Sequence, residues 1–111
     1  MGEELKQELK EEKENKASGT YVFKRPTMID GKEVTEVPYD FNLIDGSAIR
    51  RAKGALTRKG YVVAVKEYDE VFLAALFAEA SGLTLETVEK FALVDFMNVA
   101  DLTQVFWNGE A

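Results

Sequence analysis

The sequence predicts an α+β fold, in which a small N-terminal β-hairpin or sheet packs on a C-terminal bundle of about four helices. A strong turn signal lies between two β-rich stretches, and four stretches with helix-capping residues follow them. The length of 111 residues suits one domain with one modest core. We expect residues 1–17 to form a charged flexible tail and residues 18–111 to form the single domain.

The predicted hairpin is built around Asp30-Gly31, because glycine accepts a positive φ without steric cost. A strand containing residues 21–23 (Tyr-Val-Phe) precedes the turn and is expected to end at Pro26. Apolar and polar residues alternate through much of residues 34–41, which predicts a half-buried second strand. Pro38 has no N–H to donate, so it indicates an edge or a bulge in that strand.

The first predicted helix begins at residues 45–47 (Asp-Gly-Ser), whose short side chains can cap free backbone N–H groups, and it ends at Gly60. Its apolar stripe consists of Ala48, Ile49, Ala52, Ala55 and Leu56. Residues 61–65 (YVVAV) are rich in β-formers. They are expected to form either a third short strand or an extended connection.

The second predicted helix follows Asp69 and contains eight consecutive apolar residues, 71–78. A helix that is apolar on all sides is normally buried on all sides, so we expect it at the centre of the fold. Two more helices are expected. Thr84 caps a short one, and Asp95 caps another over residues 96–107.

Charge is distributed unevenly along the chain. Residues 1–17 carry a net charge of −2, residues 18–66 carry +4 and residues 67–111 carry −8, which together give the −6 of the whole chain. The basic residues form either an ordinary solvated face or a patch that attracts the acidic part, within one fold or between copies. The candidate self-association patch is Arg50, Arg51, Arg58 and Lys59.

Several function classes are disfavoured by composition. The chain has no cysteine and no histidine, which excludes thiolate chemistry and removes the commonest general base and zinc ligand. The stretch 54–60 only superficially resembles a phosphate-binding loop, because no Ser or Thr follows its lysine. We therefore expect no enzyme activity, no cofactor and no metal. We also expect no nucleic-acid partner, because an acidic chain is repelled by nucleic acid at long range.

No apolar run approaches the length of about 18 residues that a membrane span requires. The charged N-terminus is unlike a secretory signal. A soluble cytoplasmic protein without a membrane partner is therefore expected.

The C-terminal predicted helix carries more apolar side chains than one small core requires. For any one of them, the simplest interpretation is a core position. The sharper hypothesis is that some extend the apolar surface toward a partner or another copy of the chain. The candidate partner-binding residues are Phe96, Met97, Val99, Phe106 and Trp107.

Three stretches together carry a resemblance to a known family. They are Arg25-Pro26-Thr27, Tyr39-Asp40-Phe41 leading to Asp45, and the segment from Phe72 to Phe106 with Leu83-Thr84-x-Glu86 and Leu93-x-Asp95-Phe96-x-x-Val99. In this order, over residues 20–107, the features resemble those of the tail assembly chaperones of long-tailed bacteriophages and prophages.

The resemblance implies a non-enzymatic chaperone of the host bacterial cytoplasm that is absent from the mature virion. It implies binding to the tape-measure protein, which the chaperone keeps soluble, and aid to tail-tube assembly, with the tail-tube protein as a further partner. A homo-oligomer is compatible with it. The excess apolar surface of the C-terminal helix and the open edge of the hairpin are the candidate groove for the partner.

Two other classes remain open. A structural head–tail connector or tail-terminator protein would also be a small non-catalytic α+β protein, and it would be present in purified particles. A small DNA-binding regulator would show salt-sensitive retention on DNA.

Overall fold

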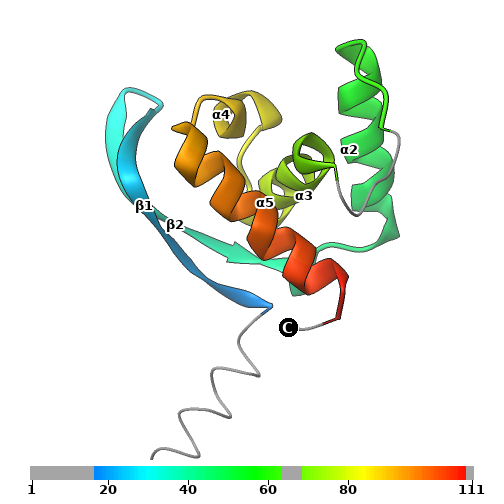
Figure 1. Cartoon of the computed structure of the whole chain (residues 1–111), viewed down its shortest axis with the longest axis horizontal. Coiled ribbons are helices and arrows are strands. Elements are labelled where there is room, and N and C mark those ends of the chain that lie inside the picture. Colours follow the sequence, from blue (N-terminus) through cyan, green and yellow to red (C-terminus); the bar gives the residue numbers. More distant parts are fainter. Residues whose placement is uncertain (1–16, 64–68, 110–111) are drawn as a thin grey trace, which may run out of the picture.

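The computed structural model describes residues 17–63 and 69–109 and confirms the α+β class. An antiparallel two-stranded hairpin is followed by a 3-10 turn and helices, and the hairpin curves along one side of the helices (Figure 1). The elements are β1 (Ser18–Ile29), β2 (Lys32–Asp40), the 3-10 turn η1 (Phe41–Leu43), α2 (Gly46–Arg58), α3 (Glu70–Ser81), α4 (Leu85–Glu89) and α5 (Leu93–Trp107).

The hairpin turn is the predicted one, and Asp30 and Gly31 both adopt a positive φ, of 52° and 79°. The prediction that the first strand ends at Pro26 is wrong, because β1 continues to the turn. Its register is irregular between Val22 and Thr27, where five steps along β1 oppose two steps along β2. Pro26 lies in this bulged stretch, where a missing N–H removes no bond between the strands.

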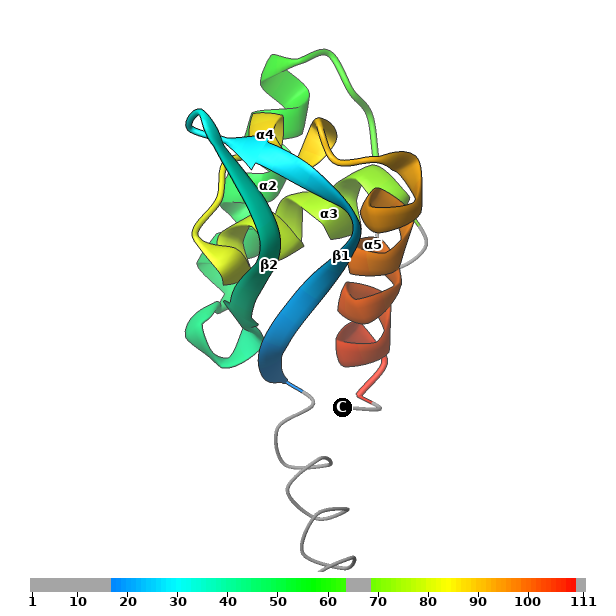
Figure 2. The ribbon, with the colours of Figure 1, turned by 90° about the vertical axis from the view of Figure 1, so that its left-hand side faces the viewer.

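Helix α3 lies at the centre of the fold, as predicted, and eight of its residues are buried. It separates two clusters of apolar side chains, with α2 on one side and the hairpin and α5 on the other (Figures 1 and 2). Helix α4 contributes to both clusters, through Leu85 on the α2 side and Val88 on the hairpin side. The hairpin-side core includes Phe23, Val37, Phe41, Phe77 and Val99. The α2-side core includes Ala48, Ala52, Leu56, Phe72 and Leu76.

Three of the four predicted helix caps are confirmed. The side chains of Asp45, Asp69 and Thr84 each accept a hydrogen bond from a backbone N–H in the first turn of the following helix. Gly82 ends α3 with a left-handed φ of 74°, which satisfies carbonyl groups at the helix end without steric strain.

The stretch 61–65 has no third strand within its described part. Residues 61–63 form no regular element, and residues 64 and 65 lie outside the described residues, as do residues 1–16 of the predicted tail. Across residues 17–63 and 69–109, no helix has both the length and the apolar character that a membrane crossing requires.

Candidate functional site

Helix α5 and strand β1 are joined by one buried carboxylate. Tyr21 Oη donates to Asp95 Oδ1 at 2.5 Å, and the backbone N–H groups of Lys24 and Arg25 donate to Oδ1 at 2.7 Å and to Oδ2 at 3.0 Å. Asn98 Nδ2 in turn donates to Tyr21 Oη at 3.1 Å. We call these five residues the Asp95 latch.

The prediction that Asp95 caps the C-terminal helix is wrong. Helix α5 begins at Leu93, Ala92 occupies the capping position without a side-chain bond, and Asp95 lies in the first turn, fully buried. The bulge in β1 explains its role, because the bulge turns N–H groups away from β2 and leaves them needing an acceptor. A carboxylate in the first turn is also favoured by the helix dipole.

The Asp95 latch shifts the ionisation of both of its titrating groups. Burial alone would raise the pKa of Asp95, but the hydrogen bonds from Tyr21, Lys24 and Arg25 outweigh burial and hold that pKa below its ordinary value. Burial, together with the bond donated to Asp95, raises the pKa of Tyr21 to about 12. The latch is therefore a neutral phenol bonded to an ionised carboxylate at neutral pH.

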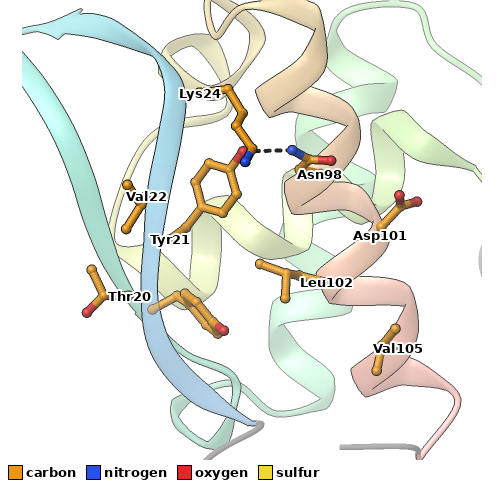
Figure 3. A pocket seen from close by; sticks show the side chains of 9 residues that line it. Thr20, Tyr21, Val22, Lys24, Asn98, Asp101, Leu102 and Val105 are labelled. Atoms are coloured by element: carbon orange, nitrogen blue, oxygen red, sulfur yellow. Dashed lines mark hydrogen bonds between the residues drawn. The ribbon is translucent and has the colours of Figure 1, made fainter.

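Beside the latch, β1 and α5 diverge and leave an open groove of about 490 Å³ (Figure 3). We call it the β1–α5 groove. Thr20, Tyr21 and Val22 line it from β1, and Leu102 and Val105 line it from α5. The apolar lining exceeds the polar lining, so the groove suits an apolar ligand with a few polar groups at its edges.

Tyr39 of β2 also lines the β1–α5 groove, and its ring centroid lies 5.3 Å from that of Phe41 and 5.7 Å from that of Phe77. The absence of a side chain at Gly19 leaves room for the Tyr39 ring, because a Cβ at residue 19 would lie only 3.1 Å from Tyr39 Oη. The rim carries Asp101, which forms no ion pair with any described residue.

The five predicted partner-binding residues are not brought together on one surface. Val99 is fully buried in the hairpin-side core, so the structure places it in the core and not at a partner surface. Phe106 is half-buried and stacks on Phe41 with 4.8 Å between ring centroids, and Phe96 packs against the same core. These side chains face inward because the curved hairpin and α3 cover that side of α5.

Met97 and Trp107 have different surroundings. Met97 is 37% exposed on the outer side of α5. Trp107 is half-buried and packs edge-on against Phe72, with 5.9 Å between ring centroids. A second cavity of about 310 Å³ lies between Trp107, Phe106 and α2-side residues such as Ile49.

Leu102 and Val105, which line the β1–α5 groove, are absent from the predicted set. The signal that could have found them is their spacing from Asn98 and Asp101, which places all four side chains on one face of the helix.

The predicted self-association patch is divided by ion pairs within the chain. Arg51 Nε lies 2.6 Å from Glu79 of α3, and Lys59 Nζ lies 3.0 Å from Glu89 and 3.4 Å from Glu86. Arg50 and Arg58 are exposed and form no ion pair with a described residue. The basic and acidic stretches therefore form ion pairs with each other within one molecule.

The fold and the site define a small α+β domain with an open, mainly apolar groove between an edge strand and a helix. Among the residues described, no group of three or more acidic side chains is arranged to hold a metal ion. The chain matches no family model, no curated protein and no solved structure.

Proposed function

We propose that this chain is a non-enzymatic phage tail assembly chaperone that binds the tape-measure protein, keeps it soluble and aids assembly of the tail tube. The proposal follows the family resemblance of residues 20–107. It places the protein in the cytoplasm of the host bacterium and outside the mature virion, with the tail-tube protein as a further partner.

The β1–α5 groove is the observation that carries this proposal. A chaperone needs apolar surface that is accessible in its folded state, bordered by polar groups that keep the free protein soluble. The groove offers this combination, since Leu102 and Val105 stand in its wall while Asp101 stands at its rim. Leu93 and Met97 of the same helix are also exposed, outside the groove.

Co-expression with the tape-measure protein of the same phage tests the proposal. The wild-type chain is expected to move the tape-measure protein into the soluble fraction and to co-purify with it. Val105→Asp, which places a charge in the groove wall, is expected to reduce both effects strongly. Val62→Asp is the matched control, because Val62 is 86% exposed and does not line the groove.

Failure of the wild-type chain to solubilise or retain the tape-measure protein would overturn the chaperone proposal. If Val105→Asp and Val62→Asp reduce solubilisation and co-purification of the tape-measure protein equally, the β1–α5 groove is not its binding site. Detection of the chain in purified, intact particles would instead favour the head–tail connector or tail-terminator class.

A further inference from the structure

The outer edge of β1, on the side away from β2, carries backbone groups that point toward α5. Thr20 is paired with Pro38, which has no N–H, so this pair belongs to the non-hydrogen-bonded kind of the antiparallel ladder. The N–H and C=O of Thr20 therefore point away from β2, and those of Val22, two residues further on, do so as well. The next outward N–H, at Lys24, reaches Asp95 of α5, which shows which element this edge faces.

The two halves of this outer edge differ. At Lys24 and Arg25 the edge is closed, because Asp95 accepts both N–H groups. The N–H groups of Thr20 and Val22 donate to no acceptor in the described part of the chain, and the β1–α5 groove lies open beside them. Proteins usually cover or twist away an edge of this kind, because it is a template for another strand.

We infer that the β1–α5 groove binds an extended segment of a partner chain, which adds as a third strand to the outer edge of β1 over residues 20–22. The partner's identity, an unfolded stretch of the tape-measure protein, rests on the proposed function. Strand addition supplies main-chain hydrogen bonds for affinity and side-chain contacts for specificity.

The backbone of the edge distinguishes a strand from other occupants. A helix in the groove would cover Thr20 and Val22 without offering partners for their N–H and C=O groups, and burying such groups unpaired is unfavourable. A second folded copy would bring its own β1 edge with α5 standing beside it, so the two edges could not approach each other closely. A lone extended segment meets neither obstacle.

The length and charge of the β1–α5 groove indicate what kind of partner segment fits it. The α5 wall runs from Asn98 to Val105, and at about 1.5 Å per residue it is about 10 Å long, which accommodates three to four residues of a strand at about 3.3 Å each. Asp101 stands at the rim with no cation partner among described residues, whereas the charge of Lys24 lies near that of Asp95. The segment is therefore apolar on its inner face and carries a lysine or arginine that meets Asp101.

Amide hydrogen exchange read by NMR tests this binding mode directly. The two ligands are the tape-measure protein and a short synthetic peptide in which valine and lysine alternate. With either ligand bound, the amides of Thr20 and Val22 are expected to become protected from exchange. The amide of Glu36, on the outer edge of β2, is expected to keep its exchange rate, because Glu36 is paired with Val22 and points its N–H the other way.

Proline substitution supplies a matched pair of variants. Val22→Pro removes an outward N–H that the hairpin itself does not use, and it is expected to weaken binding of either ligand by about tenfold or more. Glu36→Pro makes the same change on the opposite edge of the same residue pair and is expected to alter binding less than about twofold.

The outcomes separate this inference from the proposed function. Binding of the tape-measure protein without protection of Thr20 and Val22 would overturn strand addition while leaving the chaperone proposal in place. Binding and protection with the peptide, but no binding of the tape-measure protein, would support strand addition and overturn the chaperone proposal. Failure of both ligands to bind would overturn the inference.

Discussion

Replacing Asp95 by asparagine should destabilise the domain by about 2–4 kcal/mol, although the two side chains have nearly the same shape. Asp95 accepts bonds from three donors, the Tyr21 hydroxyl and the N–H groups of Lys24 and Arg25. An amide has one acceptor oxygen, so its NH₂ group faces a donor and leaves it unpaired, at a cost of about 1–3 kcal/mol. The remaining bonds lose their charge assistance, which adds about 1 kcal/mol each, and the easier burial of a neutral group offsets part of this loss.

Urea denaturation measures this loss, with far-ultraviolet circular dichroism and the fluorescence of the single tryptophan as two probes. Asp101→Asn is the control, because it removes the same charge from an exposed position of the same helix and should change stability by less than about 0.5 kcal/mol. A loss below about 0.5 kcal/mol for Asp95→Asn would refute the role assigned to the Asp95 latch.

The pH dependence of the same comparison provides an independent test. Because the pKa of Asp95 is lower in the folded chain than in the unfolded chain, its carboxylate contributes stability that is fully present above the unfolded pKa, about 3.9. That contribution is lost as the pH falls through the lower, folded pKa. The stability difference between wild type and Asp95→Asn should therefore be constant from about pH 5 to 8 and narrow below about pH 4.

Three further predictions concern other groups. In a spectrophotometric titration, Tyr21→Phe should remove a tyrosine ionisation near pH 12. In the wild type, the stability that Tyr21 contributes should be lost as the pH rises from about 10 to 12, because the pKa of Tyr21 is higher in the folded chain than in the unfolded chain. Gly82→Ala should lower the free energy of unfolding by about 1–2 kcal/mol, because residue 82 has a positive φ. Gly54→Ala should raise the free energy of unfolding by about 0.5–1 kcal/mol, because residue 54 lies inside α2, where alanine is favoured over glycine. Equal effects of the two substitutions in urea denaturation would contradict this account. The hypothesis of a basic contact between copies predicts that a double variant with Arg50→Glu and Arg58→Glu self-associates less than the wild type, because both arginines are exposed and form no ion pair with a described residue. An unchanged mass distribution in sedimentation velocity would count against such a contact.

The features that the sequence predicts correctly are those decided within a few neighbouring residues. Asp30-Gly31 forms the turn because two adjacent residues adopt a positive φ, and the caps at Asp45 and Asp69 need only the next few N–H groups. The central place of α3 was also predictable, since residues 71–78 leave it no polar face for solvent.

The errors concern features whose partners lie far away along the chain. Pro26 has the local character of a strand terminator, but the bulge around it is stabilised by Asp95, about 70 residues later. An aspartate before an apolar stretch has the character of a cap, and its burial depends on donors that only the tertiary structure supplies. The groove residues were missed for a related reason, because the sequence shows that α5 has excess apolar surface but not which side the hairpin covers.

The position of α3 between the two cores has a consequence for folding during synthesis. The hairpin and α2 leave the ribosome first, yet α2 packs against α3 and the hairpin packs against both α3 and α5, and a two-stranded hairpin is marginally stable alone. The Asp95 latch closes later still, since Tyr21 and Asp95 are 74 residues apart. Until α5 has been made, the nascent chain therefore exposes apolar surface and leaves the N–H groups of Lys24 and Arg25 without the acceptor that Asp95 later provides. Transiently exposed surface and unpaired backbone groups of this kind make an incomplete chain prone to aggregation.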